Sequence, residues 1–197
     1  MIEPIIHIDD HDSEADTCRK EVLPKLYDSQ WTDELILEQR TFTDGKIIVI
    51  GRKARRKKAK RFDYLLRYSQ NFPIAIFEAK KKYKLAADGI KQDKDYAQIL
   101  GLKFAYSTNG TEILEFDFIT GLETKVSKYP TPTELWNRLN QAEPIRPEIQ
   151  ETFLKPFFAT SGKEVRYYQR IAINQAIKAI LEGDRKSTRL NSSHGKL

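Results

Sequence analysis

Two acidic residues and one lysine interrupt two neighbouring apolar segments of this sequence. Asp63 lies in the first segment, and Glu78 and Lys80 lie in the second. A hairpin that turns at residues 70–71 places Asp63 and Glu78 directly opposite one another, with β-carbons roughly 5 Å apart. Because side chains alternate along a strand, Lys80 projects to the same face as Glu78. The pattern therefore predicts a cluster of two carboxylates and one ammonium group.

Two carboxylates held this close repel each other, so the predicted cluster needs compensation. A divalent cation provides it, and hard oxygen ligands suit Mg²⁺ or the similar ion Mn²⁺. Lys80 would then lie beside the metal, where it could orient or deprotonate a water molecule. The alternative is that these are ordinary charged residues at strand ends, without a metal.

Basic residues are concentrated just before Asp63. The chain has 197 residues and a net charge of +6, and eight of the ten residues from Arg52 to Arg61 are Lys or Arg. Such a run is either a solvated loop or a surface that neutralises the phosphates of a nucleic acid. We expect a loop that is mobile without DNA and that binds the DNA backbone through Arg52, Lys53, Arg55, Arg56, Lys57, Lys58, Lys60 and Arg61.

The composition argues against several classes of protein. Cys18 is the only cysteine, so an intrachain disulfide is impossible and a reducing compartment is expected. No apolar stretch approaches the roughly 20 residues that a membrane span needs. The three histidines do not cluster with Cys18, which argues against a zinc site. We therefore expect a cytoplasmic protein without membrane contact.

The periodicity of the chain predicts an α/β fold. Ser13 and Asp16 form a helix-start pattern, and Ala15, Cys18, Val22 and Leu26 continue it as a core-facing stripe. Pro24 should bend this helix or loosen its turn. Strands are expected at 35–42 and 46–50, joined by a turn at Asp44-Gly45, and at 102–107 and 112–118, joined at 108–110. Helices are expected at 86–100, 133–139 and about 165–181. This order favours a mixed β-sheet flanked by helices.

Several motifs together resemble the PD-(D/E)xK nuclease core, in the version found in type I restriction enzymes. They are Asp63, the triplet Glu78-Ala79-Lys80, and Gln92 followed four residues later by Tyr96. The segment 16–19 resembles the first helix of that family's motor subunit, and 166–169 resembles the segment that opens its superfamily 2 helicase motor.

The resemblance implies a set of site residues. Asp63, Glu78 and the backbone carbonyl of Ala79 would hold the metal, and Lys80 would act on the attacking water. Gln92 and Tyr96 would brace Lys80 or contact DNA. The first helix of the family usually supplies a further acid, and here Asp16 and Glu14 both remain candidates. Gln169 would read a nucleotide in the full-length subunit.

The resemblance also implies partners and a division of the chain. We expect a nuclease domain at 1–141, a linker at 142–164, the first helix of an incomplete helicase domain at 165–185, and a non-native tail at 186–197. The substrate would be double-stranded DNA, and the full complex would include methylation and specificity subunits and use ATP and S-adenosylmethionine. No phosphate-loop motif occurs, so this chain alone is not expected to hydrolyse ATP.

Two other functions fit the same residues. One is a PD-(D/E)xK nuclease of a repair or recombination enzyme, because such nucleases also join helicase motors. The other is a non-catalytic DNA-binding module whose acidic residues serve only the structure. The presence of all three charged residues argues against the binding module, and the spacing of Gln92 and Tyr96 favours restriction.

Overall fold

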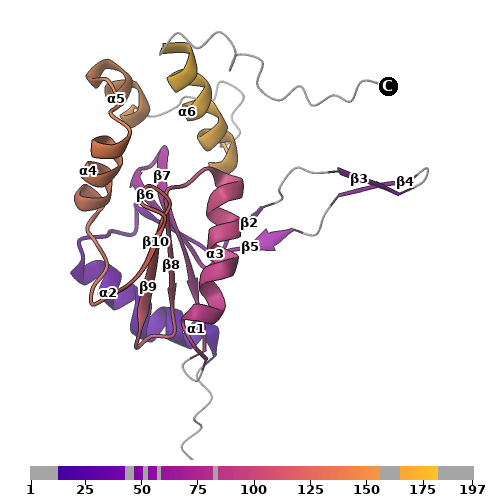
Figure 1. The fold of residues 1–197 in the computed structure, drawn as a ribbon, viewed down its shortest axis with the longest axis vertical. Helices are drawn as coiled ribbons and strands as arrows, with labels where there is room; N and C mark the ends of the chain where they lie inside the picture. Colours follow the sequence, from indigo (N-terminus) through magenta and orange to yellow (C-terminus); the bar gives the residue numbers. More distant parts are fainter. Residues whose placement is uncertain are drawn as a thin grey trace, which may run out of the picture.

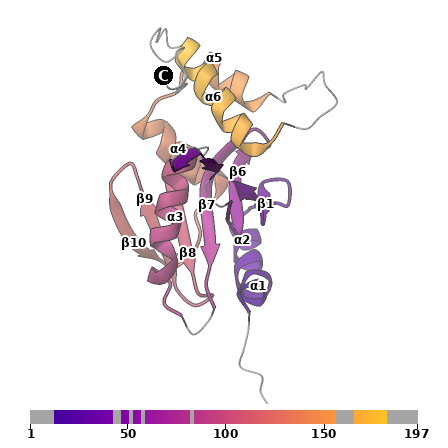
Figure 2. The same cartoon turned by 90° about the vertical axis from the view of Figure 1, so that its right-hand side faces the viewer.

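The computed structural model describes residues 13–42, 47–50, 53–56, 59–81, 84–155 and 165–181. Its centre is a six-stranded mixed sheet, flanked by helices on both faces (Figures 1 and 2). In spatial order the strands are β1 (Ile36–Glu38), β6 (Tyr64–Ser69), β7 (Phe72–Ala79), β8 (Phe104–Thr108), β9 (Ile113–Asp117) and β10 (Leu122–Val126). This confirms the predicted α/β class, although β10 was not anticipated.

The only parallel pair of the six-stranded sheet joins β7 to β8, and helix α3 (Ala87–Leu100) makes the crossover between them. A crossover is needed because parallel neighbours cannot be joined by a tight turn. The predicted buried face of this helix is confirmed, since Ile90, Ala97 and Leu100 are buried. The helix ends at Gly101, whose φ of 68° gives the left-handed conformation that favours glycine at this position.

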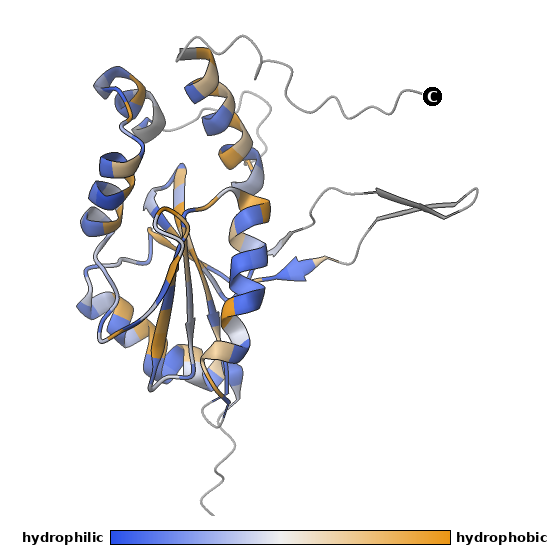
Figure 3. Ribbon diagram, in the orientation of Figure 1, coloured by the Kyte–Doolittle hydropathy of each residue, from blue (hydrophilic) through white to orange (hydrophobic). Residues whose placement is uncertain are grey.

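Alternation along β6 and β7 divides the core into two layers. Leu65 and Ile76 point toward α3, whereas Tyr64 and Phe77 point to the other face. That other face is covered by α1 (Glu14–Thr17), a π-helical turn (Cys18–Val22), α2 (Leu23–Asp28), α4 (Pro132–Ala142) and α5 (Pro147–Leu154). In Figure 3 the helices carry both hydrophilic and hydrophobic residues, as expected for helices with one face against a sheet.

The first helical segment confirms three predictions made from the sequence. Ser13 and Asp16 form a reciprocal capping box. The predicted disturbance by Pro24 is a π-helical turn, in which the N–H of Leu23 bonds to the carbonyl of Cys18. Cys18 is buried in the core, and burial raises the pKa of its thiol to about 12. The predicted stripe is wrong at Ala15, which is exposed.

The predicted hairpin between 35–42 and 46–50 is wrong. Residues 36–38 pair instead with β6 at the edge of the main sheet, where Ile36 is buried. Strand β2 (Thr41–Phe42) pairs with β5 (Lys60–Arg61), and β3 (Ile47–Ile50) pairs with β4 (Lys53–Arg56). The expected turn at Asp44-Gly45 lies outside the described residues.

The basic segment is likewise not simply a loop. Its described parts form β4 and β5, and β4 belongs to a two-stranded ribbon that lies away from the main sheet (Figure 1). The β-branched residues of Ile47–Ile50 favour extended backbone and supply the partner strand. Arg52, Lys57 and Lys58 lie outside the described residues.

The C-terminal helices pack on the same core. Ile145 and Ile149 are buried in it, so part of the expected linker forms α5 and its approach. Helix α6 (Tyr167–Leu181), close to the predicted bounds, also contacts the β6–β7 hairpin, where Asn174 donates a 2.7 Å hydrogen bond to the carbonyl of Asn71. Among the described residues, no helix is both long and apolar enough to cross a membrane.

Candidate active site

The β6–β7 hairpin has the register that the sequence predicts. Tyr64 faces Phe77 and Leu65 faces Ile76, and the chain turns at 70–71. Asp63 immediately precedes β6 and is not itself paired in the sheet. Its Oδ2 accepts a 2.8 Å hydrogen bond from the backbone N–H of Ala79. The carboxyl group of Asp63 is therefore fixed beside the strand segment that carries the predicted Glu-x-Lys triplet.

Glu78 is the centre of the polar contacts. Only 7% of the residue is exposed. Its Oε1 accepts hydrogen bonds from Lys80 Nζ at 3.0 Å and from Gln92 Nε2 at 2.6 Å. Its Oε2 is buried and has no hydrogen-bond partner among the described residues. Gln92 was expected to brace Lys80 or to contact DNA, whereas its side chain holds the carboxylate that Lys80 also contacts.

The pKa values show that the negative charge at this site is poorly compensated. Burial, and next the charge of Asp63, raise the pKa of Glu78 to about 7. Burial also raises the pKa of Asp63, and the hydrogen bond from Ala79 opposes this shift only in part. Burial disfavours the ammonium form of Lys80, but the attraction and hydrogen bond of Glu78 outweigh it, so the pKa of Lys80 is raised. Lys80 is thus a cation at neutral pH, suited to holding a water or a phosphate rather than to removing a proton.

Helix α3 approaches this cluster closely at Gly89. A β-carbon at this position would lie 2.2 Å from Oγ of Ser107 and 3.0 Å from Cε of Lys80. Ser107 cannot easily move away, because its hydroxyl donates a 2.7 Å hydrogen bond to the carbonyl of Ala86. The absence of a side chain at Gly89 therefore leaves space for the stem of Lys80.

Asp93 is a buried acid that the sequence reasoning did not single out. It is fully buried on α3, and neither of its carboxylate oxygens has a hydrogen-bond partner among the described residues. Burial, followed by the charge of Glu78, raises its pKa well above the ordinary value. Its sequence signal was an acidic residue on the buried face of a predicted helix, four residues after Gly89.

Tyr96 joins the site to the basic segment. The residue is buried, and its hydroxyl interacts with the side chain of Gln92 one helical turn earlier. The Nζ of Lys60, in β5, lies 5.0 Å from the centroid of the Tyr96 ring, a cation–π distance. One residue of the predicted DNA-binding run therefore lies directly against the predicted Gln-x-x-x-Tyr pair.

The two acids of the first helix have different surroundings. Asp16 is part of the capping box, and its Oδ2 accepts hydrogen bonds from the backbone N–H and the hydroxyl of Ser13. The charge of Glu14, in contrast, raises the pKa of both Asp63 and Glu78. Asp16 is thus engaged in the helix cap, and the charge of Glu14 reaches the two carboxyl groups.

The residues present suit a hard divalent cation. Glu78 offers an unpartnered buried oxygen, and both carboxyl groups have raised pKa values that a nearby cation would lower. The N–H and C=O of one strand residue point to the same neighbouring strand, so the carbonyl of Ala79 faces the side of Asp63. No group of three His, Cys, Asp or Glu side chains arranged for a metal occurs among the described residues. The protein would therefore supply few ligands, and water or substrate would complete the shell, as is usual for Mg²⁺.

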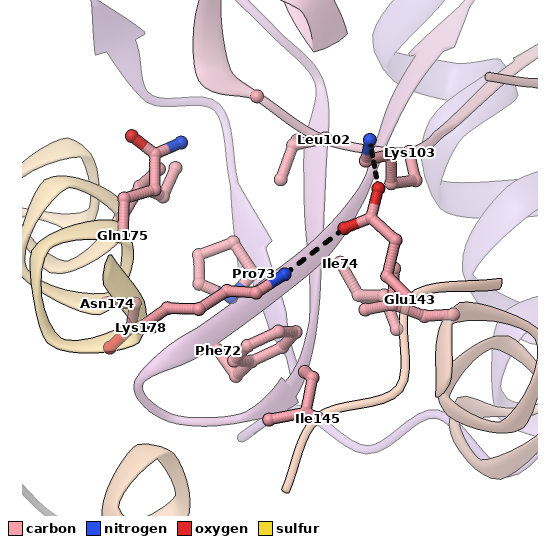
Figure 4. A pocket seen from close by; sticks show the side chains of 13 residues that line it. Phe72, Pro73, Ile74, Leu102, Lys103, Glu143, Ile145, Asn174, Gln175 and Lys178 are labelled. Atoms are coloured by element: carbon pink, nitrogen blue, oxygen red, sulfur yellow. Dashed lines mark hydrogen bonds and ion pairs between the residues drawn. The ribbon is translucent and has the colours of Figure 1, made fainter. Parts of the chain in front are cut away.

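The remaining predicted residues lie elsewhere. Gln169 caps α6, where its Oε1 accepts a 2.9 Å hydrogen bond from the backbone N–H of Arg166. A cavity of about 360 Å³ lies between the end of the hairpin and α6, and Glu143 bridges Lys103 and Lys178 at its wall (Figure 4). Neither Asp63 nor Glu78 lines this cavity, so it is distinct from the candidate active site.

Comparisons with known proteins found similar chains among type I restriction enzymes. No protein-family model matches the chain. The endonuclease subunit of the type I restriction enzyme EcoAI from Escherichia coli is 30% identical over 185 residues, which cover 88% of this chain and 22% of that protein. A solved fragment assigned as the HsdR subunit of a type I restriction enzyme from Vibrio vulnificus YJ016 is 51% identical, with a TM-score of 0.73 over 87% of this chain.

The match covers 33% of the solved fragment, so the chain spans a third or less of the length of these relatives. The sequence identity and the similarity of the fold agree on the kind of protein to which this chain is related. This chain is homologous to part of the endonuclease subunit of type I restriction enzymes.

Proposed function

We propose that this chain is the Mg²⁺-dependent endonuclease part of a type I restriction enzyme and that it cleaves phosphodiester bonds of double-stranded DNA. The observation that carries the proposal is the joint engagement of Glu78 by Lys80 and Gln92, with Asp63 fixed at the adjacent Ala79. The homology to a type I restriction endonuclease subunit supports a role in restriction.

In the proposed mechanism, Asp63, Glu78 and the carbonyl of Ala79 would hold the ion, which lowers the pKa of a water and stabilises negative charge on the phosphate. Lys80 would place its ammonium group beside the scissile phosphate and orient the attacking water. Gln92 and Lys80 occupy one oxygen of Glu78, and the other, Oε2, would be available to hold the ion. The protein thus contributes orientation and charge, which are the main requirements of phosphoryl transfer.

The basic segment would bind the DNA backbone without reading bases, because its Lys and Arg residues suit phosphates. Lys60, placed over Tyr96, brings this contact next to the site. Sequence recognition, methylation and ATP-driven translocation would come from the specificity and methylation subunits and from the motor of the whole enzyme, with ATP and S-adenosylmethionine as its cofactors.

The test is cleavage of plasmid DNA by the complete enzyme with Mg²⁺, with Mn²⁺ and with EDTA. Asp63→Ala, Glu78→Ala and Lys80→Ala should each abolish cleavage and leave ATP-driven translocation intact. A matched control is the exposed ion pair of Lys125 and Glu112, whose replacement should leave cleavage unchanged. Cleavage near the wild-type rate by any of the three site variants would remove that residue from the mechanism.

Two other functions give different results. A non-catalytic DNA-binding module would bind DNA but show no metal-dependent cleavage even in the complete enzyme. A repair or recombination nuclease would cut from DNA ends, without a requirement for an unmethylated recognition site. Comparing linear with circular substrates, and methylated with unmethylated ones, separates these possibilities from restriction.

A further inference from the structure

A second cavity, lined mainly by polar residues, lies where β1 and β6 meet the start of α6. Its volume is about 420 Å³, and neither Asp63 nor Glu78 lines it. None of the described residues that line it is acidic. Four of them are arginines, which come from three separate parts of the chain: Arg40, Arg67, Arg166 and Arg170.

The charges of these arginines are not neutralised by ion pairs with the described carboxylates. Their hydrogen bonds go to neutral acceptors. Arg67 donates to the backbone carbonyls of Glu34 and Gln70, and Arg170 donates to the side chain of Asn71 at 2.7 Å. The Nε of Arg67 is buried and has no partner among the described residues.

The arrangement places like charges together. Burial, and next the charge of Arg170, lower the pKa of Arg67, while the charge of Glu34 acts in the opposite direction. A guanidinium group does not lose its proton in proteins, so it cannot relieve this repulsion by titration. A bound anion relieves it, and guanidinium groups match the oxygens of a phosphate in geometry as well as charge.

We propose that this arginine cavity binds phosphate groups of the DNA backbone, as a site separate from the catalytic carboxylates. Its wall includes Thr41, which pairs with Arg61, two residues before Asp63. A strand of DNA held at Asp63 can therefore continue toward the cavity. Tyr168, which is 39% exposed, adds an aromatic ring of the kind on which bases stack. The inference rests on the proposed function, because it takes DNA as the substrate.

The experiment measures binding of the full chain to a fluorescent duplex of about 20 base pairs at several salt concentrations, in EDTA to prevent cleavage. The variant Arg40→Gln with Arg166→Gln removes two exposed cavity charges. We expect binding to weaken about tenfold and the log–log salt slope to fall by about 0.9 for each phosphate that the variant no longer neutralises. The control, Lys128→Gln with Arg146→Gln, removes the same charge outside the cavity and should keep the wild-type slope.

The variant Arg40→Lys with Arg166→Lys retains the charges and should also keep the wild-type slope, which separates loss of charge from damage to the fold. Equal slopes for the cavity variant and the control would overturn the inference. Displacement of the duplex by ATP, through a site that Arg40→Gln with Arg166→Gln removes, would assign the cavity to free nucleotide phosphates and overturn it too.

Failure of the inference differs from failure of the proposed function. If the cavity variant lowers the slope while the complete enzyme never cleaves DNA, the proposed nuclease falls and the cavity remains a DNA contact. If cleavage occurs and the slope is unaffected, only the cavity is wrongly assigned.

Discussion

The backbone N–H of Ala79 donates a 2.8 Å hydrogen bond to the carboxylate of Asp63, across the end of the β6–β7 hairpin. This contact ties a residue outside the sheet to the peptide between Glu78 and Lys80. It fixes one predicted metal ligand relative to the other through the main chain. The positions of the two carboxylates therefore do not depend on flexible side chains alone.

Replacement of Asp63 should separate its charge from its hydrogen bond. Asp63→Asn retains an oxygen that can accept from Ala79, whereas Asp63→Ala leaves the N–H without this partner. Both variants should lose cleavage, but Asp63→Ala should be less stable than Asp63→Asn by about 1 kcal/mol. Urea unfolding at pH 7 measures the difference. Equal stability of the two would show that water replaces the bond without cost.

The stability of the metal-free protein should fall as pH rises from about 4.5 to 7. The folded-state pKa of Glu78, about 7, lies above the ordinary 4.5, so the folded protein binds more protons in this window and is destabilised as they leave. The full difference corresponds to at most about 3 kcal/mol. Carboxyls with lowered pKa values, such as Glu143, stabilise the folded protein once the pH is above about 4.5. Their contribution hardly changes between there and pH 7, so it does not hide the decline caused by Glu78.

The matched variants for this pH dependence are Glu78→Gln and Glu112→Gln. The first removes the buried carboxyl and should flatten the decline between pH 4.5 and 7. The second removes an exposed carboxyl paired with Lys125 and should preserve the decline. Unfolding curves at four or five pH values suffice, and a decline that persists in Glu78→Gln would mean that another group causes it.

Gly89→Ala should destabilise the protein, although the same change within an exposed helix stabilises by about 1 kcal/mol. The new β-carbon would meet Ser107 at 2.2 Å and Lys80 at 3.0 Å, and such overpacking costs about 1–3 kcal/mol. Cleavage should fall as well, because Lys80 is displaced. Adding Ser107→Gly should restore much of the stability. A Gly89→Ala variant more stable than wild type would show that the helix can move away.

Asp93→Asn should become more stable relative to the wild type as the pH rises, because burial raises the pKa of the Asp93 carboxyl well above its ordinary value, whereas an amide of almost the same shape carries no charge. At higher pH the wild type should lose stability as this group ionises, and the variant should lose less. Chemical unfolding at pH 7 and pH 9 tests this. If Asp93→Asn costs several kcal/mol at pH 7, the carboxylate is ionised and paired in the native protein.

The sequence was most informative where local rules decide the structure. The register of β6 and β7, the capping box of Ser13 and the loosened helical turn before Pro24 depend on neighbouring residues, and all three predictions are confirmed. The Glu-x-Lys spacing placed Glu78 and Lys80 on one face, and the family resemblance assigned Gln92 to the same site, where it contacts Glu78. Their spacing along a strand and a helix determines which side chains share a face.

Errors arose where tertiary packing chose among local possibilities. Ile36 could pair with either a nearby strand or the distant β6, and burial at the sheet edge decided in favour of β6. The basic residues of β4 were assigned to a loop because their charge was given more weight than the apolar strand available to pair with them. Asp93 was missed although it lies on the apolar face of the predicted helix, because a charged side chain at such a position usually reaches solvent and only the packing of α3 on the sheet buries it completely.

Asn71, at the turn of the β6–β7 hairpin, is held by α6 through Arg170 and Asn174. Asp63 holds the opposite end of the same hairpin through Ala79. Slippage of one strand by a single residue would reverse the face that each side chain occupies. Glu78 and Lys80 would then point into the apolar core on the face opposite α3, where Tyr64 and Phe77 lie. With both ends fastened, such slippage would have to break both attachments at once. A helix far from the carboxylates thus helps to determine on which side of the sheet they lie.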